Sequence, residues 1–149
     1  GDGSTLLDII MTITKNNGEK RSQILSQTDL YGYNSLMLAA QYQPDAVTPI
    51  LDALFETKDS KLIFEVLSQK NLWSRNALMI AAQYQPKNVS AIIEALFKTE
   101  NKDLISSILS QTSQYGCNAL MLAARYQPKA VPNILKAIGS LDCSEQTKI

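Results

Sequence analysis

The chain of 149 residues contains no histidine and only two cysteines, so it lacks the side chains used most often in catalysis and metal binding. Without histidine, Ser-His-Asp and Cys-His arrangements are impossible, and so is every zinc site that uses an imidazole ligand. Neither Cys117 nor Cys143 belongs to a repeated disulfide or metal framework. We therefore expect free thiols in a reducing compartment, with no metal and no cofactor.

The sequence also lacks an excess of charge and any long apolar run. Lysine plus arginine number 14 and aspartate plus glutamate number 14, which argues against a nucleic-acid binder or an anionic-membrane binder. No apolar run approaches the roughly 18 residues that span a bilayer, and the N-terminus shows no signal-peptide pattern. These absences predict a soluble, cytoplasmic protein with no membrane partner.

Phosphate-binding loops and paired carboxylates are also missing. The six glycines have neither Walker nor dinucleotide-binding spacing. Acidic residues such as Asp52, Glu94 and Asp103 are scattered, and no pair is placed for acid-base catalysis. The sequence thus predicts that this chain is not an enzyme and has no small-molecule substrate. A targeting domain of a larger enzyme is a second alternative.

What the sequence does contain is one stretch that occurs three times. The copies begin at Asn34, Asn76 and Asn118, so the period is 42 residues. The second copy, residues 76–86, reads Asn-Ala-Leu-Met-Ile-Ala-Ala-Gln-Tyr-Gln-Pro. One fixed period over most of a chain is typical of a repeat array whose units stack and share one core.

Each unit is predicted to contain three short helices. The first begins at the repeated asparagine, a residue type that caps helix N-termini, and the second follows Gln-Pro. Pro49 and Pro132 fall inside the second helix, so those copies either start later or bend. The second and third helices carry regular apolar stripes, which in the middle repeat are Val89, Ile92, Ile93, Leu96 and Phe97, then Leu104, Ile105, Ile108 and Leu109.

These patterns divide the chain into an N-terminal cap, the repeats and a tail. A first helix is predicted by the helical spacing of Leu6, Ile9, Ile10 and Ile13. Asn17-Gly18 is expected to end this helix. A second helix should then carry Lys20 on a solvent-facing side. Gly139 is expected to end the last helix. The predicted boundaries are residues 1–4, a disordered end or cloning remnant; 5–28, a capping helix pair; 29–70, repeat 1; 71–112, repeat 2; 113–139, partial repeat 3; and 140–149, a tail where a longer protein has been cut.

Residues 32–51 resemble the helix pair of the ankyrin repeat, whose usual pattern is G-x-T-P-L-H-x-A-A, a turn, then V-V-x-L-L. The matching positions are Gly32, Leu36, Ala39, Ala40, Val47, Ile50 and Leu51, then Gly116, Leu120, Ala123, Ala124, Val131, Ile134 and Leu135. The repeats depart from that pattern in having Asn-Ser/Ala for Thr-Pro, methionine for histidine, and 42 residues in place of about 33. The resemblance implies a right-handed α-solenoid of three-helix, ankyrin/armadillo-like repeats that binds other proteins.

The third copy, residues 118–128, reads Asn-Ala-Leu-Met-Leu-Ala-Ala-Arg-Tyr-Gln-Pro. This sequence also resembles repeats in effector proteins that intracellular bacterial pathogens deliver into host cells. The resemblance implies that the chain is part of a larger effector that acts on host proteins in the host cytosol.

The candidate binding residues are those that differ between repeats at expected exposed positions. Aromatic residues and arginine dominate protein-protein hot spots, because they bury a large area at modest entropic cost. The predicted partner-binding residues are Tyr31, Tyr33, Trp73, Arg75 and Tyr115 in the turns, with Gln41, Gln83 and Arg125 on the first helices. The competing interpretation is that each turn residue packs only over its own repeat.

Tyr42, Tyr84 and Tyr126 stand at one position in every repeat. Such a ladder presents three phenols to a peptide, or it packs on the next unit with its hydroxyls bonded to the backbone. Identity between units favours the packing interpretation.

The sequence as a whole predicts a non-catalytic protein-protein interaction module, a repeat scaffold whose partner is another protein. The alternative is a nucleic-acid-binding helical repeat, in which aromatics or arginines stack on single-stranded bases. The mixed charges at one position, Asp45, Lys87 and Lys129, argue against a basic track along the repeats.

Overall fold

A computed structural model describes the backbone of residues 3–146 and the side chains of residues 5–141. All regular elements in this part of the chain are helical and none is a strand, which confirms the expected all-α class. In chain order they are α1 (Gly3–Ser26), α2 (Ser35–Tyr42), η1 (Pro44–Ala46), α3 (Val47–Glu56), α4 (Ser60–Ser68), α5 (Ala77–Tyr84), α6 (Lys87–Lys98), α7 (Lys102–Ser110), α8 (Ala119–Tyr126), η2 (Pro128–Ala130) and α9 (Val131–Gln146).

The first helix of each repeat, α2, α5 or α8, begins where the asparagine predicts. The Oδ1 atoms of Asn34, Asn76 and Asn118 each accept a hydrogen bond at 2.9 Å from the amide three residues later. Each asparagine has extended backbone angles, as a helix cap requires. The predicted caps are therefore confirmed.

The two proline-containing helices start later than their middle copy. In the first and third repeats a 3-10 turn, η1 or η2, precedes α3 and α9, which begin at Val47 and Val131. The middle copy, α6, begins two positions earlier in the repeat, at Lys87. Pro49 and Pro132 thus fall within the first turn, where a missing N–H removes no intrahelical bond.

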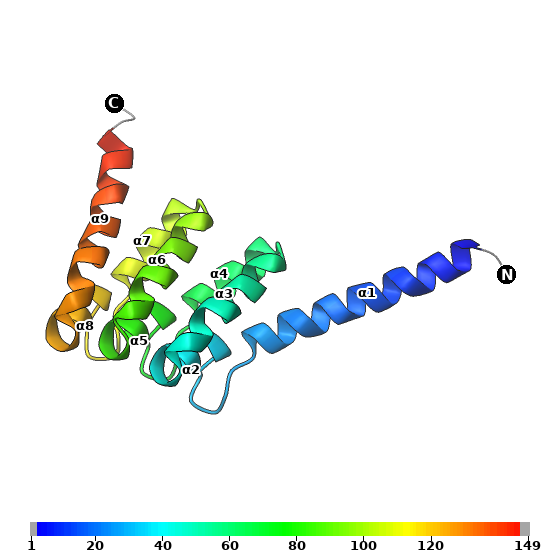
Figure 1. The fold of residues 1–149 in the computed structure, drawn as a ribbon, viewed down its shortest axis with the longest axis horizontal. Helices are drawn as coiled ribbons and strands as arrows, with labels where there is room; N and C mark the ends of the chain where they lie inside the picture. Colours follow the sequence, from blue (N-terminus) through cyan, green and yellow to red (C-terminus); the bar gives the residue numbers. More distant parts are fainter. Residues whose placement is uncertain (1–2, 147–149) are drawn as a thin grey trace.

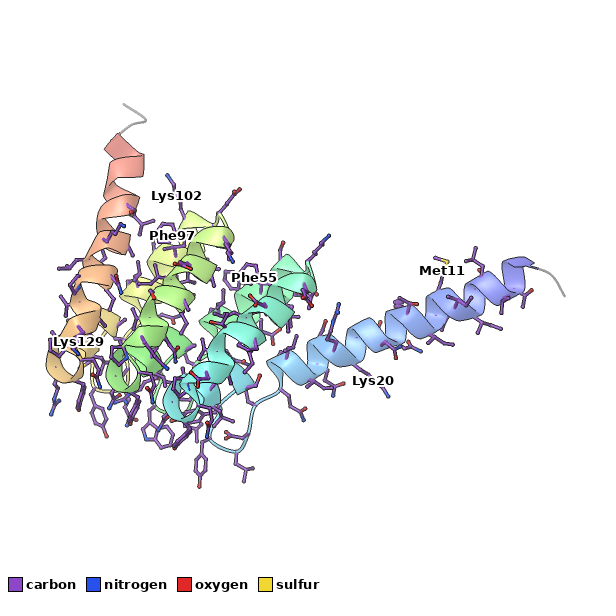
Figure 2. All side chains as sticks on the ribbon, in the orientation of Figure 1. Met11, Lys20, Phe55, Phe97, Lys102 and Lys129 are labelled. Atoms are coloured by element: carbon purple, nitrogen blue, oxygen red, sulfur yellow. The ribbon has the colours of Figure 1, made fainter. Side chains whose placement is uncertain are left out.

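Helices at equivalent positions of successive repeats pack side by side. α5 lies between α2 and α8, α6 lies between α3 and α9, and α4 packs on α7 (Figure 1). Phe55 and Phe97, which Figure 2 labels, lie near the C-terminal ends of α3 and α6. Equivalent helices of successive repeats are therefore neighbours in the structure.

The centre of the core is α5. Its residues 77–82 are all buried, including the side chains of Leu78, Met79 and Ile80. Ala81 and Ala82 are also fully buried, and small side chains at these positions let neighbouring helices approach closely. Since α2 and α8 cover both sides of α5, this helix has no solvent-facing stripe in its first six residues.

The N-terminal segment differs from the predicted helix pair. α1 is one continuous helix through Asn17-Gly18, because Gly18 keeps a helical backbone and a mid-helix glycine costs only about 1 kcal/mol relative to alanine. Leu6, Ile9, Ile10 and Ile13 are each more than half exposed, so this stripe does not face the core.

Only the C-terminal end of α1 joins the stack. Leu25 packs against the core, and the Ser26 carbonyl accepts a hydrogen bond of 3.1 Å from Gln69 Nε2. Ile24, by contrast, is exposed. The rest of α1 extends away from the other helices, with Met11 and Lys20 projecting from it (Figures 1 and 2). Contact with α4 is therefore what positions this helix.

The last helix also continues past its predicted end. α9 runs through Gly139 to Gln146, so the first part of the predicted tail is helical. A glycine ends a helix when it adopts a positive φ, and among the described glycines only Gly32 and Gly116 do so. Residues 1–2 and 147–149, and the side chain of Cys143, lie outside the described residues. Cys117 is a half-buried free thiol.

Two of the capping asparagines also join helices within a repeat. Asn76 Nδ2 donates to Gln111 Oε1 at 2.7 Å and to the Ile108 carbonyl at 3.4 Å, and Asn34 makes the same pair of bonds to Gln69 and Val66. Asn118 has no such second-helix bonds among those described, because the third repeat has no α4 or α7 counterpart there.

We expect Asn76→Ala to lower the free energy of unfolding by about 2 kcal/mol, since it removes a cap and leaves Gln111 Oε1 unpaired inside the protein. Asn118→Ala removes the cap alone and should cost about 1 kcal/mol. Urea denaturation of the two variants measures the difference. Equal losses would show that the bonds to Gln111 and Ile108 contribute nothing.

Candidate functional site

The turn before the first helix of each repeat is built on one side-chain oxygen. Asn71 Oδ1 accepts from the amides of Trp73 and Arg75, at 2.9 and 3.1 Å. Asp29 Oδ1 does the same for Tyr31 and Tyr33, and Ser113 Oγ for Tyr115 and Cys117. Short polar side chains favour such local turns. The backbone carrying the variable aromatic residues is therefore fixed in the same way in every repeat.

Main-chain hydrogen bonds then join one turn to the next. The Leu72 amide donates to the Tyr31 carbonyl at 3.0 Å, and the Gln114 amide donates to the Trp73 carbonyl at 2.9 Å. These bonds align the three turns in one row. Tyr31, Trp73 and Tyr115, which are 42 residues apart, are thereby held along one edge.

Close approach of the turns explains one glycine. Gly32 has φ of 82°, and a Cβ there would lie 3.0 Å from Asn71 Cα, so both its backbone angle and its neighbour disfavour a side chain. Gly116 has the same φ, but a Cβ would meet nothing within 4 Å. Ser74, the middle counterpart, takes φ of 59° with a side chain present. At Gly32, therefore, contact with the next turn disfavours a side chain in addition to the positive φ, whereas at Gly116 a side chain would meet no neighbour.

Next to this row of turns lies a groove of about 380 Å³, which we call the aromatic groove. It spans all three repeats, because its walls come from their turns and from the C-terminal ends of α2 and α5. Its lining residues are Tyr33, Gln41, Tyr42, Trp73, Arg75, Gln83, Tyr84 and Tyr115. Five of these eight side chains are aromatic, one is a cation and none is a carboxylate.

Trp73 is the centre of the aromatic cluster. Its ring is stacked with Tyr31, with centroids 6.0 Å apart and planes at 28°, and meets Tyr33 edge-on at 6.2 Å. These are favourable geometries for aromatic pairs. Trp73 nevertheless remains 37% exposed. The cluster therefore presents a preorganised aromatic surface, with little side-chain entropy left to lose on binding.

The polar groups of the aromatic groove are incompletely paired. Arg75 Nη1 donates to Gln83 Oε1, and Gln41 Nε2 donates to Tyr42 Oη at 3.1 Å. Arg75 Nε and Gln41 Oε1 are buried and have no hydrogen-bond partner within the chain. Most buried polar atoms in proteins are paired. Of the four buried side-chain atoms without a partner among the described residues, these two belong to residues that line the groove.

Burial raises the pKa of Tyr33 above its ordinary value, and the neighbouring phenols of Tyr42 and Tyr84 raise it further. The nearby Arg75 cation and the Asn71 side chain oppose this rise in the pKa of Tyr33. Tyr33 is therefore a neutral phenol at physiological pH, able to donate its own hydrogen bond.

In a titration followed by phenolate absorbance, we expect a component above the ordinary pKa of tyrosine, about 10, and its loss in Tyr33→Phe. Because the folded-state pKa is raised, the stability due to neutral Tyr33 is complete below the unfolded-state pKa, about 10. It is lost as pH rises through the folded-state pKa. Tyr33→Phe should thus weaken the fall of stability at alkaline pH. A variant that loses only an ordinary component would contradict this assignment.

Six of the eight predicted partner-binding residues line the aromatic groove: Tyr33, Gln41, Trp73, Arg75, Gln83 and Tyr115. Tyr31 is not among the lining residues and is stacked on Trp73. Arg125 lies outside the lining, with its guanidinium 5.1 Å from the centroid of the Tyr126 ring. The turns and first helices thus converge on one site, although the third repeat contributes only Tyr115.

Tyr42 and Tyr84, for which the sequence left a peptide-binding role open and favoured a packing role, also line the aromatic groove. They are 62% and 41% exposed, and the hydroxyl of Tyr42 bonds to a side chain instead of the backbone. The sequence signal for their place in the groove was that each directly follows a predicted partner-binding residue, Gln41 or Gln83. The residues that do join the repeats here are Gln85 and Gln127, whose Nε2 atoms donate to the carbonyls of Gln41 and Gln83 at 3.4 and 3.1 Å.

The described residues include no group of three or more His, Cys, Asp or Glu side chains placed to hold a metal ion. None of the described helices is both long and apolar enough to cross a membrane. No family model, curated protein or solved structure matches the chain. The features that describe this part of the chain are therefore its helices and the aromatic groove, which residues of all three repeats line.

Proposed function

We propose that this chain is a non-catalytic protein-binding module and that the aromatic groove is its binding surface. The observation that carries the proposal is the convergence of Trp73, Arg75 and the tyrosines from three repeats on one preorganised groove. Tryptophan, tyrosine and arginine are the residues most enriched in binding hot spots. A groove that crosses three units suits a partner that runs along the stack.

A protein partner suits this groove better than a nucleic acid does. Arg75 is the only cation among its lining residues, whereas a bound nucleic-acid strand requires several cations along its phosphates. The balanced charge of the chain, 14 basic against 14 acidic residues, agrees with this choice. Stacking of bases on Trp73 and Tyr84 is the competing use of the same rings.

At the level of the fold, we propose an ankyrin-like, right-handed α-solenoid. Support comes from the capped helices at a 42-residue spacing and from packing of α2, α5 and α8 in order. Hydrogen bonds between successive turns and between successive Gln-Pro segments also repeat along the stack. A role within a bacterial effector, a cytoplasmic location and the absence of catalysis stay predictions from the sequence.

The experiment is affinity capture from cytosolic lysate with the parent chain, Trp73→Ala and Phe64→Ala, at about 50 and about 200 mM salt. Phe64 is an exposed aromatic residue on α4, outside the aromatic groove, and so provides a matched control. We expect specific proteins to be retained by the parent and by Phe64→Ala at both salt concentrations and lost with Trp73→Ala.

Two other results would reject the proposal. Retention of nucleic acid that is released at the higher salt concentration would assign the groove to single-stranded bases. Proteins retained equally by Trp73→Ala and the parent would place the binding surface elsewhere.

A further inference from the structure

Arg75 is a cation whose charge is not neutralised inside the protein. Its Nη1 donates to Gln83, which is a neutral partner, and no aspartate or glutamate lines the aromatic groove. Within the described residues, the one ion pair joins Lys87 to Asp45 at 3.1 Å. An arginine held by an amide in an aromatic setting therefore keeps its capacity to pair with an anion.

The unpaired edge of Arg75 has a defined shape. Gln83 engages Nη1, while Nε has no partner. Nε and Nη2 form the side edge of the guanidinium, which binds a carboxylate through two parallel hydrogen bonds. Nε lies beneath the groove surface, so a ligand reaches it through rotation of the flexible arginine side chain.

Gln41 provides a second unpaired group, which is a hydrogen-bond acceptor whereas Arg75 Nε is a donor. Its Oε1 is a buried acceptor without a partner, and its Nε2 is held by Tyr42. A main-chain amide is the donor that an extended polypeptide offers at every residue. Arg75 and Gln41 together thus suit an acidic side chain and a backbone N–H, the groups of a short peptide segment.

The aromatic residues of the groove indicate which side chains a bound segment would carry near its acidic residue. In an extended segment, side chains two residues apart point to the same side, so the residues two positions before and after an acidic one reach the same groove as it does. Trp73, Tyr84 and Tyr115 offer exposed ring surface in or beside the groove. Aromatic or branched apolar side chains would bury that surface.

We propose that the aromatic groove binds an extended protein segment in which an aspartate or glutamate pairs with Arg75, next to apolar side chains that pack on Trp73 and Tyr115. This inference rests on the proposed protein-binding function and narrows its partner to an acidic, apolar-flanked segment. It excludes a basic segment, because Arg75 would repel it.

The probe is a displayed library of random nine-residue peptides, selected on the whole chain. We expect selected peptides to share an acidic residue with an aromatic or branched apolar residue two positions away. For a synthetic selected peptide, Glu→Gln or Asp→Asn should weaken binding roughly 10-fold, and Arg75→Gln in the protein should do the same. With both changes the loss should stay near that of either alone, which identifies them as one pair.

Lys98→Gln is the matched control, since Lys98 is a cation on α6 that lies 6.0 Å from the Phe55 ring, away from the groove lining. It should leave peptide binding unchanged. Helical circular dichroism of Arg75→Gln should match that of the parent.

The outcomes separate the two proposals. Peptides that require Trp73 but show no acidic preference and no dependence on Arg75 would overturn the acidic-segment inference and leave the protein-binding function standing. Peptides that bind equally to Trp73→Ala and the parent would overturn both.

Discussion

Replacement of Met79 with alanine is expected to lower the free energy of unfolding by about 3 kcal/mol. Met79 is 0% exposed on α5, so its removal deletes buried methylene groups and leaves a cavity that neighbouring helices only partly close. Because α5 lies between α2 and α8, the loss weakens the packing on which the centre of the stack depends.

The repeat supplies its own control for this effect. Met121 occupies the same position in the third repeat but is 51% exposed, since no further repeat covers it within the chain. Met121→Ala should therefore cost less than about 1 kcal/mol. Chemical denaturation followed by circular dichroism measures both variants. Similar losses at the two positions would mean that α5 is not the buried centre of the molecule.

Trp73→Ala is expected to weaken partner binding by about 30-fold or more, as removal of a central aromatic hot-spot residue typically costs at least about 2 kcal/mol. The truncation removes the ring that organises both Tyr31 and Tyr33. It leaves the turn intact, because Asn71 binds the backbone amide of residue 73 and not its side chain. Fluorescence anisotropy of a labelled peptide from the selection measures the change in Kd.

Phe64→Ala should bind that peptide as the parent chain does, because Phe64 lies outside the aromatic groove. Trp73→Tyr should recover part of the affinity, since it restores a ring with a polar edge. An equal loss in Phe64→Ala and Trp73→Ala would attribute the effect to stability and not to the groove.

The regular features of the fold could be predicted because they are encoded locally and repeated. An asparagine that caps a helix, a proline that starts one and an apolar stripe of helical period each act within a few residues. Three copies of the same signals at Asn34, Asn76 and Asn118 then made the all-α class evident.

The two ends of the chain could not be predicted in the same way. Gly18 and Gly139 both occur in patterns that often end helices, yet both helices continue through them. Whether a glycine adopts a positive φ depends on the surrounding structure, and its small helical penalty is easily outweighed. Likewise, the apolar stripe from Leu6 to Ile13 gives a helix but does not specify what the helix contacts.

The candidate site was predictable where residue type and variation between repeats agreed, as at Trp73 and Arg75. The role of Tyr42 and Tyr84 could not be decided from the sequence, because identical residues in successive repeats satisfy a packing role as well as an exposed one. Their exposure follows from their place at the C-terminal ends of α2 and α5, beside the stacked turns. That juxtaposition is a tertiary feature that the repeat pattern does not reveal.

The most direct test of the aromatic groove as the binding surface uses its own fluorophore. Trp73 is the only tryptophan in the chain, so its emission reports on this groove alone. Titration with a selected peptide lacking tryptophan should shift the emission to shorter wavelength, with the same Kd as that measured by calorimetry. A peptide that binds by calorimetry without any change in Trp73 emission would contradict the account.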